Sequence, residues 1–121
     1  KKIITPEDLV NEPMIHSRRD SAFYSKLEEV FTSRNVKING WIETRQFNSA
    51  CMLVSEGRGV SIVSEMDARE YENRGLIIRP FKPLITHNLI LVRPKHTALS
   101  TIASEFIEFF EKSLEPFRLK S

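Results

Sequence analysis

The sequence has one cysteine, Cys51, and three histidines in 121 residues. A single cysteine excludes an internal disulfide and any zinc site built from several cysteines. The histidines are scattered along the chain, and no two of them have the spacing of metal ligands. We therefore expect no metal site and no cofactor, and a reducing cytoplasm is the simplest compartment for the protein.

The chain also lacks a long apolar run and a large charge of one sign. No apolar segment is long enough to span a bilayer, and the N-terminal residues lack the apolar core of a signal peptide. Lys and Arg total 18 against 16 Asp and Glu, and a net charge of +2 does not by itself indicate nucleic-acid binding. We expect one compact domain with no membrane partner.

Short apolar runs that alternate with amphipathic segments dominate the sequence. The runs predict strands, which we place at residues 13–17, 36–43, 60–63, 76–79 and 88–92. The amphipathic segments predict a short helical turn at 5–9 and helices that begin at Asp20 or Ser21, at Asn48 or Ser49, at Asp67 and after Ser100. This alternation favours an α/β fold with a mainly parallel sheet and right-handed crossovers.

The last helix, expected to end near Leu114, has the strongest amphipathic pattern. Its apolar stripe includes Ala103, Phe106, Ile107 and Phe110, with Ile102 and Phe109 on its flanks. In a lone domain of this length a stripe this wide would belong to the core. In a fragment it should dock on a part of the sheet that is missing, or on another chain.

Ligands of open α/β sheets bind beyond the carboxyl ends of the strands, which nominates three turns. The first contains Ser17, Arg18, Arg19, Asp20 and Ser21. Two guanidinium groups beside a helix N-terminus can hold an anion, because unpaired N–H groups and the helix dipole favour negative charge there. The alternative is that both arginines are solvated and that Asp20 or Ser21 only caps the helix.

The second turn contains Gln46, Phe47 and Asn48, whose amide groups can orient a small polar ligand. The alternative is a hydrophobic staple at Phe47 followed by a capping residue. The third turn begins at Ser64, a further candidate for contact with a ligand.

No catalytic constellation is present. Cys51 has no histidine near it in sequence, and the glycines of Gly57-Arg58-Gly59 follow a helix and precede a strand, the reverse of a dinucleotide-binding loop. A phosphorylated receiver domain needs an aspartate after the third strand, where this chain has Ser64, and a small α/β enzyme needs a nucleophile with a base. A solute-binding protein would need an export signal. We expect the chain not to be an enzyme.

Several segments, in order, resemble the effector-binding domain of LysR-type transcription regulators. They are Ile4 to Leu9 with Glu12 to Ile15, Phe47 to Val63, Tyr71 with Gly75 to Phe81, Asn88 to Pro94, and Leu99 to Phe110. The most recognisable is the helix that ends in Val-Ser-Glu-Gly-Arg-Gly-Val and leads into a strand. Within the family, the resemblance is nearest to regulators of opine and basic amino-acid catabolism.

The resemblance implies a Rossmann-like lobe of a periplasmic-binding-protein-like (type 2) domain. Residues 1–83 would form lobe two, and residues 84–121 would cross back to add a strand and a C-terminal helix to lobe one. The winged helix-turn-helix domain would precede residue 1, so DNA would be bound only through that absent segment. The effector, an amino acid, an opine or another small carboxylate, would lie between the lobes, and the effector domain would self-associate.

Overall fold

The computed structural model describes residues 2–118. Its internal contacts form two units, the first of which ends at His87 while the second begins at Asn88. No helix within residues 2–118 combines the length and the apolar character needed to cross a membrane.

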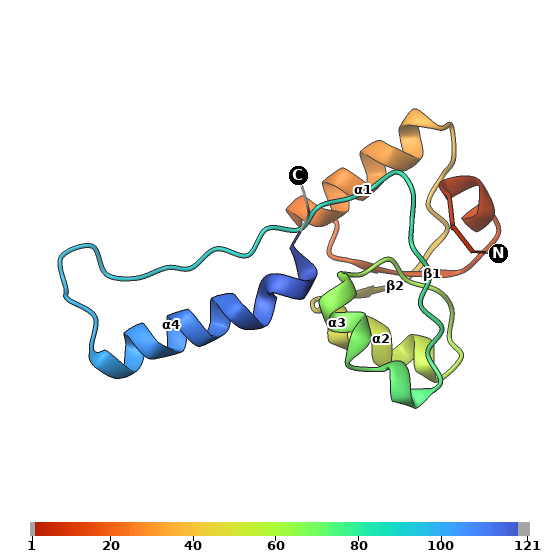
Figure 1. The fold of residues 1–121 in the computed structure, drawn as a ribbon. Helices are drawn as coiled ribbons and strands as arrows, with labels where there is room; N and C mark the ends of the chain where they lie inside the picture. The colour runs from red at the N-terminus through yellow and green to blue at the C-terminus, as the bar shows by residue number, and fades with distance from the viewer. Residues whose placement is uncertain (1, 119–121) are drawn as a thin grey trace. The chain divides into compact units, whose positions relative to one another are not determined.

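The first unit is a parallel α/β structure built around strand β1 (Met14–Ser17) (Figure 1). Strand β2 (Gly40–Thr44) pairs with β1 in parallel, with His16 opposite Glu43. On the other edge of β1, the backbone N–H of Ile15 donates to the carbonyl of Val60 at 2.8 Å, which forms a parallel bridge. The spatial order is therefore β2, β1 and then the segment at Val60.

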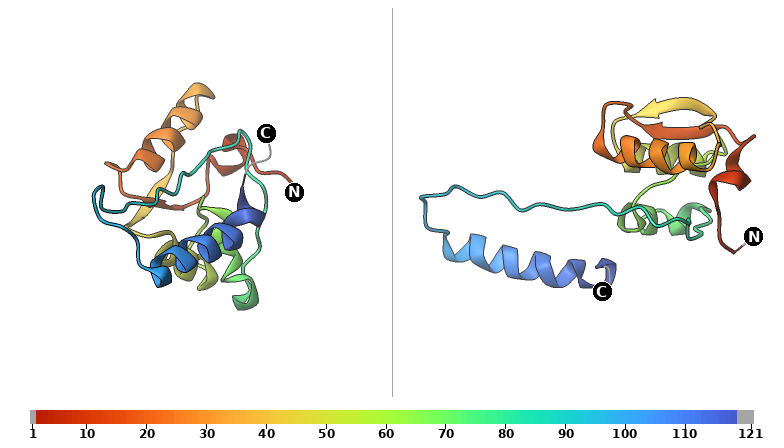
Figure 2. Two further views of the ribbon diagram at one scale, coloured as in Figure 1. Left: turned by 60° about the vertical axis from the view of Figure 1, so that its left-hand side comes forward. Right: turned by 90° about the horizontal axis from the view of Figure 1, so that it is seen from above.

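Helices cover both faces of this sheet. Helix α1 (Ala22–Ser33) lies on one side, and helices α2 (Phe47–Ser55) and α3 (Glu65–Arg69) lie on the other (Figures 1 and 2). Single turns of 3-10 helix at Pro6–Leu9 and Glu72–Arg74 complete the unit. This layering confirms the α/β class and the parallel pairing expected from the sequence.

Helix α1 forms where the sequence predicts it, because its cap and its apolar stripe agree. The hydroxyl of Ser21 accepts a hydrogen bond from the backbone N–H of Tyr24 at 3.1 Å. Leu27 and Phe31 are buried one turn apart and pack against Met14 of β1. Full burial of such side chains contributes roughly 1.5–3 kcal/mol each, so this contact fixes α1 on the sheet.

Four expected strands differ from the structure. The second begins at Gly40 instead of Val36, the third is reduced to the bridge at Val60, and residues 76–79 and 88–92 form no strand. A strand exists only where a neighbour accepts and donates its backbone hydrogen bonds. In the 76–82 segment the only ladder contact among described residues is at Phe81, which bridges to Ile4.

Two helix boundaries also differ from the expectation. Helix α2 begins at Phe47, because Gln46 is the extended residue before it, so neither Asn48 nor Ser49 is its cap. The helix expected from Asp67 to Asn73 begins earlier, at Glu65, and breaks into a 3-10 turn that ends at Gly75 in the left-handed conformation.

The second unit consists of an extended segment, helix α4 (Thr101–Leu114) and a 3-10 turn at Glu115–Phe117. Ser100 caps α4, accepting a hydrogen bond from the backbone N–H of Ala103 at 3.1 Å, as predicted. No α4 side chain is buried, and Ile102 and Phe109 are 79% and 71% exposed. The apolar face of α4 is therefore only partly covered within the described residues, because Ala103, Ile107 and Leu114 are half-buried while its flanks are exposed.

Candidate functional site

The three candidate turns belong to one edge of the sheet. Parallel pairing of β1 with β2 and with Val60 sends the carboxyl ends of these segments in the same direction. From that edge the chain enters α1 on one face and α2 on the other (Figure 1). In open α/β sheets, ligands bind where neighbouring strands are followed by helices on opposite faces of the sheet.

The first turn is ordered largely by its own polar groups. The guanidinium of Arg18 pairs with the carboxylate of Asp20 at 2.7 Å, and both side chains are exposed. The hydroxyl of Ser21 donates to the carbonyl of Arg18 at 2.6 Å and caps α1, and it lies 3.4 Å from the hydroxyl of Ser17. Ser21 is therefore the cap of α1, and its hydroxyl both donates and accepts hydrogen bonds within the turn.

Arg19 differs from Arg18 because its guanidinium has no carboxylate partner among the described residues. Its backbone N–H donates to the carboxylate of Glu43 at 3.1 Å, which ties the first turn to the end of β2. None of the ion pairs among residues 2–118 involves the guanidinium of Arg19, which is exposed. Arg19 is therefore the cation of this turn best placed to meet an anionic ligand.

His16 and Tyr24 are buried side chains that lie close to Arg19. The ring of His16 is 4% exposed, lies 5.2 Å from the ring of Tyr24, and its Nδ1 is 2.8 Å from the carbonyl oxygen of Ser17. Burial raises the pKa of the Tyr24 hydroxyl, an effect that Arg19 opposes and Glu28 and Glu43 reinforce. His16 is therefore a packed residue of the strand.

The second turn presents exposed amide groups. The side-chain oxygen of Asn48 accepts a hydrogen bond from the backbone N–H of Ser49 at 2.9 Å, and the Thr44 hydroxyl donates to the carbonyl of Gln46 at 3.2 Å. The Gln46 side chain makes no capping hydrogen bond and is exposed. Gln46 and the amide nitrogen of Asn48 are free to turn toward a ligand at this edge.

Phe47 packs within the first unit. Its ring lies 4.9 Å from the ring of Phe23 and 5.4 Å from that of His87, in edge-to-face geometry. Sequence reasoning missed this cluster, because His87 is 64 positions from Phe23 and no local pattern connects them.

Ser64 caps helix α3. Its hydroxyl accepts from the backbone N–H of Asp67 at 3.3 Å and makes a short hydrogen bond with the Asp67 carboxylate. Both groups are partly buried. The Ser64 hydroxyl is therefore engaged within the first turn of α3, and its contact with a ligand stays a prediction.

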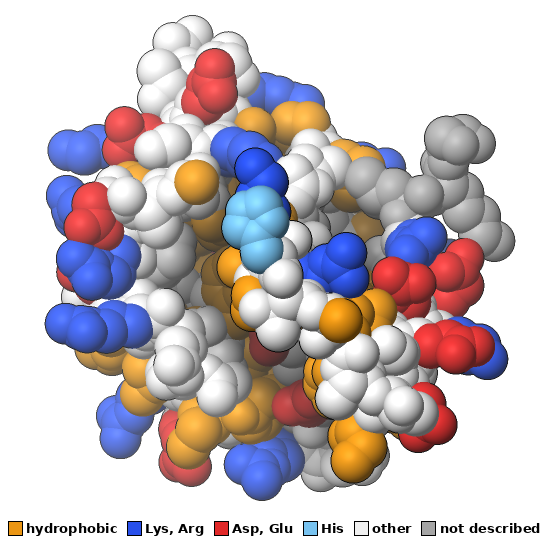
Figure 3. Space-filling view, turned by 90° about the vertical axis from the view of Figure 1, so that its left-hand side faces the viewer, with side chains coloured by type: hydrophobic (Ala, Val, Ile, Leu, Met, Phe, Trp, Pro, Cys, Tyr) orange, Lys and Arg blue, Asp and Glu red, His pale blue; other side chains and the backbone are white. Residues whose placement is uncertain are grey.

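Groups that could support catalysis or metal binding do not assemble in the described residues. Burial raises the pKa of the Cys51 thiol, and Asp67 reinforces the effect. No three His, Cys, Asp or Glu side chains within residues 2–118 are grouped as metal ligands. Figure 3 shows basic, acidic and hydrophobic side chains on the face that it draws.

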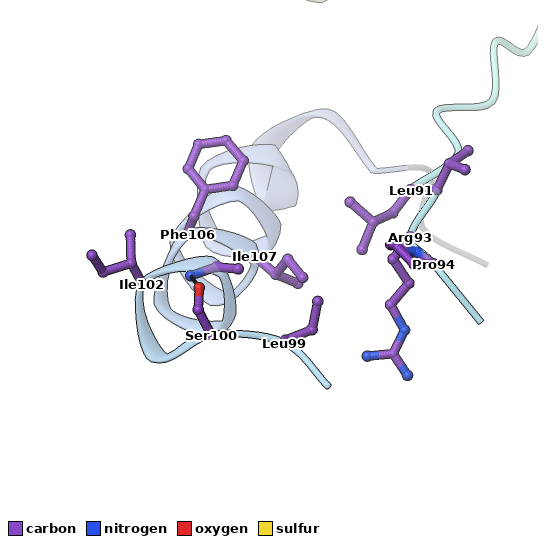
Figure 4. Close-up of a pocket in the computed structure, with 10 residues that line it drawn as sticks. Leu91, Arg93, Pro94, Leu99, Ser100, Ile102, Phe106 and Ile107 are labelled. Carbon is purple, nitrogen blue, oxygen red and sulfur yellow. Dashed lines mark hydrogen bonds between the residues drawn. The ribbon is translucent and has the colours of Figure 1, made fainter. Parts of the chain in front are cut away.

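The second unit carries an apolar groove of its own. Figure 4 shows Ile107 of α4 and Leu91 of the extended segment facing each other across it. Its remaining lining residues are Val92, Arg93, Pro94, Leu99, Ser100, Ile102, Ala103 and Phe106. A groove lined almost entirely by apolar side chains suits packing against another protein segment better than binding a polar metabolite.

Comparison with known proteins identifies the family. The family model of the LysR substrate binding domain matches residues 1–115. The transcriptional activator protein LysR of Escherichia coli (strain K12) is 32% identical over 106 residues, which cover 88% of this chain and 34% of that protein. The chain thus spans about a third of the length of this curated relative.

These matches agree with the sequence resemblance and with the α/β fold of a periplasmic-binding-protein-like (type 2) domain. They also decide among the alternatives, because the matched family is a binding domain and neither a receiver domain nor an enzyme. On these grounds, the chain belongs to the LysR substrate-binding domain family.

Proposed function

We propose that the chain is the effector-sensing part of a LysR-type transcription regulator and that it binds a small polar or anionic metabolite at the carboxyl edge of its sheet. The observation that carries the proposal is the exposed guanidinium of Arg19, which no carboxylate pairs with in the described part of the chain. Arg19 is in the turn that precedes α1, whose N-terminal dipole also favours an anion. One Nη atom of its guanidinium lies 3.7 Å from the position that a Cβ atom on Gly40 would occupy, at the start of β2.

The other candidate residues come from the three turns that follow the strands. The first turn supplies Ser17, Arg18, Asp20 and Ser21, the second supplies Gln46, Phe47 and Asn48, and the third supplies Ser64. Guanidinium, amide and carboxylate groups together complement a ligand that carries both an ammonium and a carboxylate. We therefore infer an amino acid, an opine or another small carboxylate as the effector class.

We further propose that the site is half of an inter-lobe cleft. In this account residues 1–83 form lobe two, and residues 84–121 return to complete lobe one. The exposed apolar face of α4 and the apolar groove beside Leu91 support this assignment, since both have the character of surfaces that pack on protein. Their occupant would be the part of lobe one that lies outside these 121 residues.

The mechanism would be allosteric. An effector that binds one arrangement of the two lobes more tightly shifts the population toward it, and the shift changes the spacing of the DNA-binding domains in the self-associated regulator. DNA would be contacted through a separate domain of the whole protein, and the site of action would be the cytoplasm.

The test compares Arg19→Ala with Arg34→Ala in the full-length regulator. Arg34 lies just after α1 and pairs with Glu7 at 3.2 Å, so its loss removes an exposed arginine away from the proposed site. A charged hydrogen bond is worth about 1.5–3 kcal/mol, so Arg19→Ala should raise the effector concentration for half-maximal reporter response about 10- to 100-fold. An unchanged dose response in Arg19→Ala, across a panel of amino acids, opines and small carboxylates, would refute the assignment.

A further inference from the structure

Three aromatic rings meet at the edge of the sheet that carries the candidate turns. Phe23 and Phe47 lie 4.9 Å apart at an interplanar angle of 74°, and the ring of His87 lies 5.4 Å from Phe47 and 6.2 Å from Phe23. All three pairs have the edge-to-face geometry that aromatic rings prefer. We call Phe23, Phe47 and His87 the aromatic trio.

Each ring of the trio comes from a segment with a different task. Phe23 is in the first turn of α1, two residues after the capping Ser21. Phe47 is the first residue of α2 and lies between Gln46 and Asn48. His87 is the last residue of the first unit, and the second unit begins at the next residue. The trio thus joins both effector turns to the point at which the chain leaves the unit.

A hydrogen bond from α1 holds the residue next to His87. The ammonium group of Lys26 donates to the carbonyl of Thr86 at 3.3 Å. Helix α1 thus contacts residue 86 through Lys26 and residue 87 through the ring of Phe23. Helix α2 contacts residue 87 through the ring of Phe47. His87 is nevertheless exposed overall, so its position depends on these contacts and not on burial in the core.

We propose that Phe23 and Phe47 are positioning residues that hold His87, so that a displacement of either effector turn changes the backbone where the chain enters the second unit. This inference rests on the proposed function, because an effector is what would displace the turns. Phe47 then acts by holding the connection, while the neighbouring amide groups of Gln46 and Asn48 contact the effector.

The test measures motion directly after the trio, in the full-length regulator and without any effector. A nitroxide label is attached at Asn88→Cys in a background in which the other cysteines are replaced, and its electron paramagnetic resonance spectrum is recorded. Phe47→Ala removes one of the two ring contacts of His87, and His87→Ala removes both. Since one aromatic pair is worth about 0.5–1.5 kcal/mol, Phe47→Ala should raise the ratio of mobile to immobile label about 2- to 10-fold and His87→Ala should raise it at least as much. The double variant Phe47→Ala/His87→Ala should show little rise beyond that of His87→Ala. His87→Phe keeps a ring at this position and should give the same spectrum as the labelled protein with the trio intact.

Two further variants separate the trio from a general loss of structure. Trp41→Ala removes an exposed ring on β2, outside the trio, and should leave the label unchanged. Phe47→Leu keeps an apolar side chain at the start of α2 and should still raise the mobile fraction. An unchanged spectrum in both Phe47→Ala and Phe47→Leu, or an equal rise in Trp41→Ala, would overturn the proposal. Because no effector is present, this result is independent of the Arg19 dose response, which tests the proposed function.

Discussion

The carbonyl oxygen of Pro13 lies 2.5 Å from the position that a Cβ atom on Gly59 would occupy. The same oxygen accepts a hydrogen bond from the backbone N–H of Val60 at 3.1 Å, which joins this segment to the edge of β1. Gly59 has a φ of +148°, so both the conformation and the space require glycine. The second glycine of the family motif is therefore explained by a close approach of two backbones.

Gly59→Ala is expected to destabilise the domain by about 2–3 kcal/mol, because backbone strain and a steric clash add. Gly57→Ala is the matched control. Gly57 has a φ of +77° with nothing within 4 Å of its Cβ position, so only the left-handed conformation should cost free energy, about 1 kcal/mol. Urea unfolding measures the loss of stability in both variants, and the loss in Gly59→Ala should be the larger. An equal loss would show that the contact with Pro13 is unimportant.

Ser21 offers a way to separate helix capping from effector binding. Ser21→Ala should lower the free energy of unfolding by about 1 kcal/mol, because the backbone N–H of Tyr24 loses its acceptor. Ser21→Asp should restore the cap and the stability, while its negative charge weakens the response to an anionic effector. Thermal melting and the reporter response check the two effects. Normal effector response in a stable Ser21→Asp regulator would place the ligand away from this residue.

Cys51 should react slowly with alkylating agents in the folded protein, because its side chain is 1% exposed and burial raises its pKa. The control is Cys51→Ala combined with Met52→Cys, which moves the thiol to an exposed neighbouring position. The folded chain holds the thiol proton more tightly than the unfolded chain does, so stability should fall as pH rises above the ordinary thiol pKa. Cys51→Ala should flatten that decline. Fast alkylation of native Cys51 would contradict the burial.

Helix α4 tests the assignment of the second unit to lobe one. If segments of the whole protein cover its apolar face, Phe109→Glu should destabilise the full-length regulator by about 2–4 kcal/mol, because a charge would be buried without a partner. Ser104→Glu adds the same charge to an exposed serine of the helix and should change stability by less than about 0.5 kcal/mol. Differential scanning calorimetry distinguishes the two. A neutral Phe109→Glu would mean that the face remains in solvent.

Helices were predictable from the sequence where a cap and an apolar stripe act within a few residues. Ser21 with Leu27 and Phe31 defined α1, and Ser100 with the stripe through Phe106 defined α4. Strands were less predictable, because residues 76–79 and 88–92 have strand-like composition but no strand neighbour among residues 2–118. Local sequence cannot report whether a partner strand is present.

The edge of the sheet that carries the candidate turns was predictable from strand order. The hydrogen bonds and ion pairs that each side chain forms there were not. The pairing of Arg18 with Asp20 depends on turn geometry that no spacing rule gives. The cap at Ser64 follows the Ser-x-x-Asp spacing of Ser64 and Asp67, a signal that the sequence analysis did not use. The contact of Arg19 with Glu43 spans 24 positions, and the aromatic trio spans more. Such contacts arise from tertiary packing, so they became visible only with the fold.

The central claim, that the turns at 17–21 and 46–49 bind the effector, is tested most directly by hydrogen–deuterium exchange of the full-length regulator. Exchange is compared with and without each member of a panel of amino acids, opines and small carboxylates. A compound that raises the melting temperature should slow exchange in peptides that cover both turns, because binding orders them. Protection confined to other segments, with both turns unchanged, would contradict the account.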